Sequence, residues 1–194
     1  YCSNQLAKTT DDAFKTVVTD LLNYGAAAQV YTNYKTDDLA NAGVDQTYAT
    51  ANLATEPVKQ LNTEYATIEN PTVIWKGASL YLESKVNARL TIEARDLTGL
   101  SVKFVIDGVE YTSNNFEAQP DKENRYYVYF DSIIPSQMRT PFTATVYKDG
   151  VAVSNTLQYS IQSYVVGKTT AGVALNDMLV AMLKYADACK AYFG

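Results

Sequence analysis

The residues best suited to chemistry in this sequence are aromatic. Sugar-binding modules use exposed Trp and Tyr rings, whose flat faces stack on pyranose rings while polar neighbours bond the hydroxyls. In the run Arg125–Phe130, strand alternation places Tyr127 and Tyr129 on one face and Val128 and Phe130 on the other. Since the Val and Phe face suits a core, we expect Tyr127 and Tyr129 to point outward.

Two more aromatic residues join this set. In the run Ser79–Glu83 the same alternation buries the leucines and exposes Tyr81, and Trp75, the sole Trp, precedes Lys76-Gly77 at a strand end. Trp75, Tyr81, Tyr127 and Tyr129 are therefore the candidate ligand-binding residues. A second interpretation stays open, in which these rings seal the sheets against a pair of helices.

Residues for catalysis are scarce. The chain has no His, which removes the commonest general base, and its nine Gly are dispersed, without a phosphate-binding loop. Glu83, Glu93 and Asp96 are the carboxylates that a glycosidase would need, but acidic residues on the solvent face of strands are ordinary. We predict that the protein is not an enzyme and uses no cofactor.

Metal sites are also not expected. Asp37, Asp38 and Asn41 cluster oxygen atoms, but their spacing matches no calcium-binding loop, and a short turn explains them. Two Cys and no His cannot fill the four positions of a zinc site.

The two cysteines, Cys2 and Cys189, allow two interpretations. Each lies near one end of the chain, and a single disulfide between them would account for both. Alternatively, Cys189 is a buried thiol on a helix face, which is common for Cys. Both interpretations stay open.

Composition restricts the setting. The chain has 194 residues, 47% hydrophobic and 19% charged, with a net charge of −5, which indicates a globular protein. Its sixteen basic residues are scattered, so nucleic acid is not an expected partner, and no apolar stretch is long enough for membrane insertion. The sixteen Tyr and abundant Thr suit solvent-facing β-structure, and we expect an extracellular or cell-surface location.

A repeated segment predicts the helices that frame the chain. Leu21–Tyr31 returns near the end as Met182–Tyr192. The first helix begins after Thr10 and the last spans about Ala174 to Phe193, each with one amphipathic stripe. We expect the two stripes to pack as an antiparallel pair. The expected contacts join Tyr24, Ala28 and Tyr31 to Tyr185, Cys189 and Tyr192.

Between the helices the pattern predicts a polar connector and then β-structure. Thr36–Gly43 indicates a short helical turn. From Pro71 the period is two, and the dipeptides Asp107-Gly108 and Asp149-Gly150 predict hairpins. The predicted strands are Thr72–Lys76, Ser79–Ser84, Ala88–Ala94, Ser101–Ile106, Val109–Thr112, Arg125–Phe130, Phe142–Lys148 and Val151–Ser163.

The predicted fold class is α+β, with an antiparallel immunoglobulin-like β-sandwich flanked by the packed N- and C-terminal helices. We expect one unit over residues 1–194. Its parts are the first helix in 1–34, the connector in 35–70, the sandwich in 71–165 and the last helix in 173–194.

Several of these segments resemble a module of large secreted or surface proteins from anaerobic gut Gram-positive bacteria. The resemblance rests on Leu21–Gln29, Thr36–Asn41, Gly77–Glu83 and the terminal helix Met182–Phe193, and it covers most of the chain. In those proteins the module accompanies repeats, carbohydrate-active enzymes or attachment domains. The resemblance implies an extracellular location and a non-catalytic character, and it assigns no functional residue.

The predicted function is a non-catalytic module of an extracellular multidomain protein, serving as a structural spacer or an adhesion surface. The alternative is a carbohydrate-binding module that stacks sugars on exposed Tyr and Trp rings. The expected partners are a glycan, a host or bacterial surface protein, and adjacent modules of the parent chain.

Overall fold

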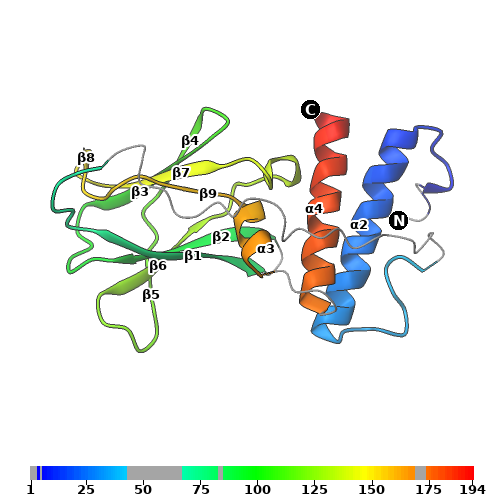
Figure 1. Ribbon diagram of the computed structural model, residues 1–194, viewed down its shortest axis with the longest axis horizontal. Helices are drawn as coiled ribbons and strands as arrows, with labels where there is room; N and C mark the ends of the chain where they lie inside the picture. The colour runs from blue at the N-terminus through cyan, green and yellow to red at the C-terminus, as the bar shows by residue number, and fades with distance from the viewer. Residues whose placement is uncertain (1–3, 5, 43–66, 83–84, 169–173) are drawn as a thin grey trace. The chain divides into compact units, whose positions relative to one another are not determined.

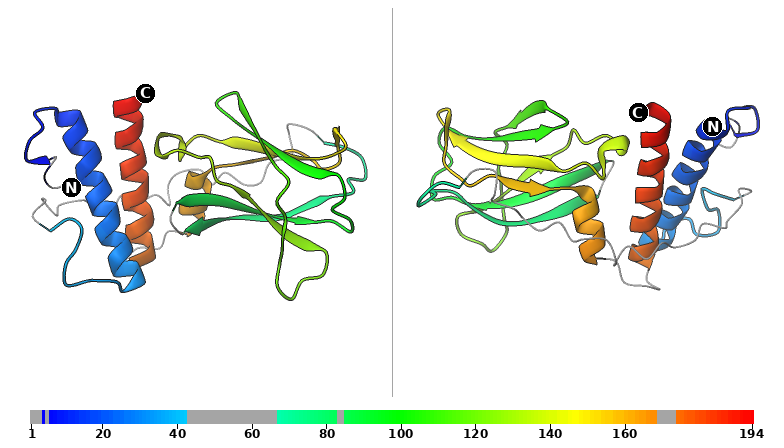
Figure 2. Two further views of the ribbon diagram at one scale, coloured as in Figure 1. Left: turned by 180° about the vertical axis from the view of Figure 1, so that it is seen from behind. Right: turned by 45° about the horizontal axis from the view of Figure 1, so that its top comes forward.

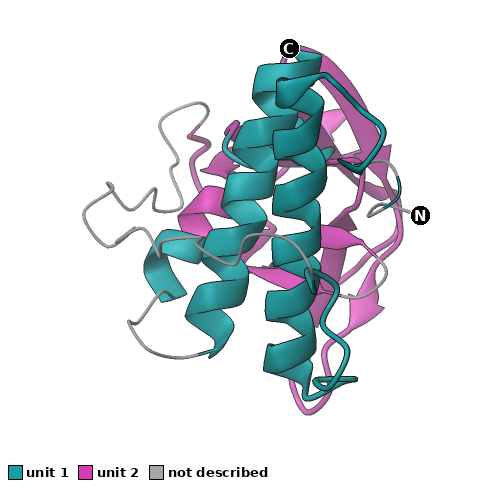
Figure 3. Cartoon of the chain, turned by 90° about the vertical axis from the view of Figure 1, so that its right-hand side faces the viewer, with its two compact units in different colours: residues 1–57, 134–139, 165–194 teal, residues 58–133, 140–164 magenta. Residues whose placement is uncertain are grey.

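A computed structural model of the chain describes residues 4, 6–42, 67–82, 85–168 and 174–194. It divides into two compact units (Figure 3). We call residues 1–57, 134–139 and 165–194 the helical unit and residues 58–133 and 140–164 the sheet unit. The expectation of a single unit over 1–194 stays a prediction, because two compact units can still unfold together.

The helical unit contains the predicted antiparallel pair. Helix α2 spans Asp12–Thr32 and helix α4 spans Ala174–Phe193, and they run in opposite directions side by side (Figures 1 and 2). At one end the ring of Phe14 lies 5.7 Å from the ring of Tyr192. No helix in the described part of the chain is long and apolar enough to cross a membrane.

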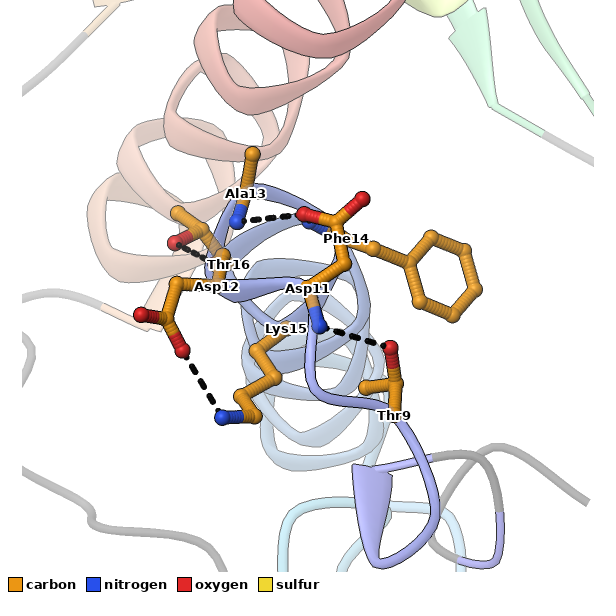
Figure 4. Close-up of polar contacts among 7 residues, drawn as sticks. All are labelled: Thr9, Asp11, Asp12, Ala13, Phe14, Lys15 and Thr16. Atoms are coloured by element: carbon orange, nitrogen blue, oxygen red, sulfur yellow. Dashed lines mark hydrogen bonds and ion pairs between the residues drawn. The ribbon is translucent and has the colours of Figure 1, made fainter.

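The predicted start of α2 is confirmed, and its N-cap is Asp11 (Figure 4). One carboxylate oxygen of Asp11 accepts hydrogen bonds from the backbone N–H groups of Ala13 (3.0 Å) and Phe14 (3.1 Å). Thr9 supports this cap, since its hydroxyl accepts from the Asp11 N–H at 3.2 Å. These bonds satisfy donors that the first turn of a helix leaves without partners.

The predicted contacts between the helices are wrong in register. The buried positions of α2 are Val17, Val18, Leu22, Asn23, Ala26 and Ala27. Tyr31 is exposed, and the partners of Cys189 and Tyr185 include Val17 rather than residues at the end of α2. An antiparallel pair brings the start of one helix to the end of the other, so the two copies of the repeat cannot meet at equivalent positions.

The segment after α2 folds back along that helix in turns. The Asp38 N–H donates to the Lys35 carbonyl at 3.1 Å, and the Ala42 N–H donates to the Leu39 carbonyl at 2.9 Å. Two turns thus replace the predicted helical turn, whose Gly43 lies outside the described residues, as does most of the connector.

Side chains of α2 hold these turns. The Gln29 amide nitrogen donates to the carbonyls of Lys35 (3.1 Å) and Asp38 (2.9 Å), and its oxygen accepts from the Ala40 N–H at 2.7 Å. A Cβ added to Gly25 would lie only 3.1 Å from that of Ala40, so the turn needs a small residue on the helix there.

The sheet unit contains two antiparallel sheets (Figure 1). The four-stranded sheet has the order β1 (Ile74–Leu82), β2 (Val86–Glu93), β6 (Arg125–Phe130) and β5 (Glu117–Ala118). The five-stranded sheet has the order β4 (Val109–Ser113), β3 (Leu100–Ile106), β7 (Phe142–Lys148) and β8 (Val151–Ala152), and β9 (Leu157–Tyr159) also pairs with β7. Two short helical segments complete the chain, namely η2 (Pro135–Gln137) and α3 (Ile161–Lys168).

Both predicted hairpins are present. Asp107 and Gly108 have φ values of 50° and 78°, and Asp149 and Gly150 have 49° and 83°. Positive φ at both central residues is the signature of the type I′ turn, which matches the twist of the flanking strands.

Two strand predictions need correction. Thr72–Lys76 and Ser79–Ser84 are one strand, β1, with a bulge between Trp75 and Gly77, and Ser84 lies outside the described residues. The predicted strand Val151–Ser163 is interrupted.

The interruption has a visible cause. The hydroxyl of Ser154 accepts the Val146 N–H at 2.8 Å, a donor that a continuous ladder would use, so β8 and β9 are separate. The Ser160 hydroxyl then accepts the Ser163 N–H at 3.0 Å, and the residues from Ile161 are helical. A side-chain hydroxyl that competes for the backbone is a common way to end a strand or begin a helix.

The Asp11 cap yields a first prediction. The variant Asp11→Ala should lower the free energy of unfolding by about 1 kcal/mol, because two helix N–H groups lose their acceptor. The variant Asp11→Asn keeps an acceptor oxygen and is the matched control, with a smaller loss. Urea unfolding followed by circular dichroism at the helix band measures both, and equal stability of the alanine variant and the parent would contradict the assignment.

The hairpin glycines yield a second prediction. Gly108 has open space where a Cβ would lie, yet its φ of +78° strains any side chain, so Gly108→Ala should cost about 1 to 2 kcal/mol. Gly77 also has nothing within 4 Å and no positive φ, so Gly77→Ala should stay within about 0.5 kcal/mol of the parent. Thermal or urea unfolding compares the two, and equal effects would contradict the turn assignment.

Candidate binding surface

The register of the four-stranded sheet gathers polar and aromatic side chains on one face. Arg89 in the middle of β2 lies opposite Ser79 on β1 and Tyr129 on β6. The neighbouring positions Leu90 and Val128 are fully buried, so they face the core. We call the opposite side, which carries Arg89 and Tyr129, the outer face.

Four side chains on the outer face form what we call the tyrosine–arginine cluster: Tyr81, Arg89, Tyr127 and Tyr129. The Arg89 guanidinium lies 4.5 Å from the ring centre of Tyr127 and 5.6 Å from that of Tyr81. Tyr129 contacts both other rings, at 5.3 Å from Tyr81 and 6.5 Å from Tyr127. Cation–π attraction and ring packing thus hold the four together.

Hydrogen bonds fix the edges of the cluster. Arg89 Nε donates to the Ser79 hydroxyl at 3.1 Å, and the Ser79 hydroxyl donates to the Arg89 carbonyl at 3.3 Å. The Tyr129 hydroxyl donates to a carboxylate oxygen of Glu117 on β5 at 2.9 Å. Burial, and next the hydrogen bond to Glu117, raises the pKa of Tyr129 to about 12.

Of the four predicted ligand residues, Trp75 is not in this cluster. It lies opposite Ile92, which is fully buried on the core side, and its indole N–H donates to the Asn155 carbonyl at 2.7 Å. Strict alternation would put Trp75 on the same side as Tyr81, but the bulge between Trp75 and Gly77 reverses the direction of the earlier residue. Its role in ligand binding stays a prediction.

Sequence reasoning missed Arg89 and Glu117. Arg89 lies between Ala88 and Leu90, so the alternation that exposes Tyr81 would also have exposed it. Glu117 belongs to a two-residue strand, which no periodicity can reveal.

A hollow of about 300 Å³ adjoins the cluster at Tyr129. Its walls also include Tyr111, Asn115, Asp131 and Ser132. This volume is at the small end of the range for ligand sites.

The candidate catalytic carboxylates lie in ion pairs. Glu93 contacts Lys76 at 3.1 Å and Arg125 at 3.4 Å, and the hydrogen bond to Lys76 contributes most to lowering its pKa. The Asp96 pKa is held well below its usual range by the Thr98 N–H and by Lys148 at 2.9 Å. A general acid needs a raised pKa, so neither environment suits that role. Glu83 lies outside the described residues.

The oxygen-bearing residues Asp37, Asp38 and Asn41 lie in the turns that follow α2. Asp37 and Asp38 are exposed, and the Asn41 side-chain nitrogen donates to the buried Asn23 oxygen at 3.0 Å. Over the residues with described positions, no group of three or more His, Cys, Asp or Glu side chains is placed to hold a metal ion.

Cys189 is a free and buried thiol in the structure, packed against Val17 and Tyr185. Burial is the main cause that raises its pKa. Cys2 lies outside the described residues, so the disulfide between Cys2 and Cys189 stays a prediction.

Comparison with known proteins gives no relative. No family model, no curated protein and no solved structure matches the chain.

The Tyr129 contact yields a third prediction. Because the folded pKa lies above the ordinary value of about 10, the folded state keeps the proton more tightly, and stability should fall as the pH rises from about 10 to 12. In Tyr129→Phe this loss should be smaller. Tyr159, whose pKa burial also raises, contributes to both proteins, so their difference isolates Tyr129.

Urea unfolding at pH 8, 10 and 11 measures this difference, and the absorbance of tyrosinate follows the titration directly. Parallel pH profiles for the parent and the phenylalanine variant would contradict the prediction.

Proposed function

We propose that the protein is a non-catalytic module of an extracellular multidomain protein, and that the outer face is its adhesion surface. The observation that carries the proposal is the tyrosine–arginine cluster, in which three Tyr rings and one Arg contact one another on one side of a sheet. Tyr and Arg are enriched among the residues that dominate binding interfaces.

In this proposal the two sheets form an immunoglobulin-like sandwich. Support comes from rings of both sheets that pack together, since Phe104 on β3 stacks on Phe130 on β6 at 4.6 Å with planes inclined by 4°. A sandwich is a rigid support, and such supports present binding groups with little loss of conformational entropy on association. A module that served only as a structural spacer would not need this half-buried cluster on the outer face.

A carbohydrate-binding module is the second candidate function. The geometry of the rings argues against the simplest version of it, in which sugars stack on a flat row of rings. The planes of Tyr81 and Tyr129 are inclined by 53°, and those of Tyr127 and Tyr129 by 55°. The rings therefore make no flat platform on which sugars of one chain could stack in succession. A sugar bound here needs polar contacts as well as a ring.

Binding assays with immobilised probes test the adhesion surface. The probes are mucin, fibronectin, pectin and xylan, and the variant is Tyr127→Ser with Tyr129→Ser. Where the parent binds, the double variant should bind at least roughly tenfold more weakly. Truncating a tyrosine at the centre of an interface commonly costs more than the ~1.4 kcal/mol that corresponds to a tenfold change in Kd.

The matched control is Tyr147→Ser, which removes a half-buried tyrosine from β7 of the other sheet and should bind like the parent. Full binding by the double variant would contradict the assignment of the outer face. A parent chain that binds none of the probes would favour the spacer role instead.

A further inference from the structure

Arg89 has hydrogen-bonding capacity that the sheet does not use. Its Nε donates to Ser79, but its two terminal nitrogens have no acceptor among the described residues, and no carboxylate of that part of the chain pairs with it. Of the other described arginines, Arg125 and Arg139 contact Glu93 and Asp187, whereas Arg95 is exposed and lies outside the outer-face cluster. Neither terminal nitrogen of Arg89 is a buried atom without a partner. Both are therefore accessible to solvent.

The guanidinium is held in position before any ligand arrives. Tyr127 lies under it at 4.5 Å, Tyr81 is 5.6 Å away, and Ser79 holds Nε. A planar guanidinium fixed in this way offers two parallel N–H donors, which match the two oxygens of a carboxylate. Fixing it in advance reduces the entropy lost on binding.

An unsatisfied acceptor lies beside these donors. Asn87 is two residues before Arg89 on β2, opposite Tyr81 and on the same outer face, at roughly 6.6 Å along the strand. The residue is only 9% exposed, and its buried oxygen has no hydrogen-bond partner in the described structure. A buried acceptor without a donor is costly, but this oxygen is closed to solvent, so a ligand hydroxyl would reach it only after a neighbouring side chain moved.

The chemistry of the face favours a sugar over a protein surface. On β2 the outer face presents Asn87, Arg89, Thr91 and Glu93, and the neighbours of Arg89 on β1 and β6 are Ser and Tyr side chains. The exposed aliphatic residue of this face, Ile74, lies opposite Glu93 at the start of β1, away from Arg89. The centre of a protein–protein interface is dry and more apolar, whereas a sugar needs rings interleaved with hydrogen-bonding groups.

We propose that the outer face binds a carboxylated sugar residue, a uronic or a sialic acid, through Arg89. The sugar carboxylate accepts from the terminal nitrogens of Arg89, and a C–H face of the ring lies on Tyr81. This inference rests on the proposed function, since it names the ligand class of the same adhesion surface.

Isothermal titration calorimetry tests the proposal with sialyllactose and digalacturonic acid, which separate the two sources of the carboxylate. Lactose and the methyl ester of digalacturonic acid are the neutral counterparts. We expect at least one acid to bind, and its neutral counterpart to bind at least roughly tenfold more weakly, because a charge-assisted bidentate contact is lost.

Two variants that each remove one positive charge test whether Arg89 makes the contact with the sugar carboxylate. Arg89→Gln should lose the binding, whereas Arg125→Gln, which removes an arginine from the same face, should keep it. Arg89→Lys retains the charge without the planar fork and should bind more weakly than the parent. Far-UV circular dichroism checks that each variant is folded, and the comparison of acid with ester needs no variant at all.

The experiments distinguish failure of the carboxylated-sugar proposal from failure of the proposed adhesion surface. Equal binding of acid and neutral sugar, no binding of either acid, or full binding by folded Arg89→Gln would overturn the inference. A glutamate-rich peptide that bound through Arg89 while both acids failed would overturn the sugar class and leave the adhesion surface intact. The adhesion surface itself fails if Tyr127→Ser with Tyr129→Ser leaves binding to the immobilised probes unchanged, or if the parent chain binds none of them.

Discussion

The buried ring of Phe130 fixes the direction in which strand β6 presents its side chains. It stacks on Phe104 at 4.6 Å and contacts Phe142 at 5.0 Å and Tyr111 at 5.4 Å. Since side chains alternate along a strand, an inward Phe130 requires an outward Tyr129. A slip of one residue would expose Phe130 and bury the polar hydroxyl of Tyr129, so the aromatic core determines which side chains lie on the outer face.

The same core depends on the two hairpins. Phe104 lies on β3 and Phe142 on β7, and β3 lies between β4 and β7 in its sheet. The turn at Asp107-Gly108 sets the pairing of β3 with β4, and the turn at Asp149-Gly150 sets that of β7 with β8. Two turns with positive φ thus hold the aromatic residues at the register that the ring contacts require.

The helical unit shows how one repeated segment produces two different helices. In α2 the buried positions form a single stripe, from Val17 to Ala27. In α4 every residue from Met178 to Leu183 is buried, and both α2 and η2 contact this helix. A helix covered on several sides needs apolar residues all round, whereas α2 keeps one face for the polar contacts of Gln29 with the turns.

Local rules are sufficient for much of the fold. The start of α2, the Asp-Gly turns and the alternation in Arg125–Phe130 depend on neighbours within a few residues, and the sequence predicts all three. It does not predict the side of Trp75, because a bulge is set by pairing with β2 rather than by the strand itself. The break after Ala152 depends likewise on a hydroxyl that meets Val146 across the sheet. Contacts distant in sequence decide such features, and one sequence does not show them.

The charge states of the site argue for binding over proton transfer. Catalytic carboxylates are held partly protonated by burial, but here Glu93 and Asp96 reach solvent and are ion-paired, which favours their charged forms. The cation of the tyrosine–arginine cluster, Arg89, has two terminal nitrogens without an acceptor among the described residues, and it lies between tyrosine rings. A cation held in place by rings and by the Ser79 hydroxyl is suited to holding an anion. These charge states therefore support the proposal that the outer face binds a carboxylate.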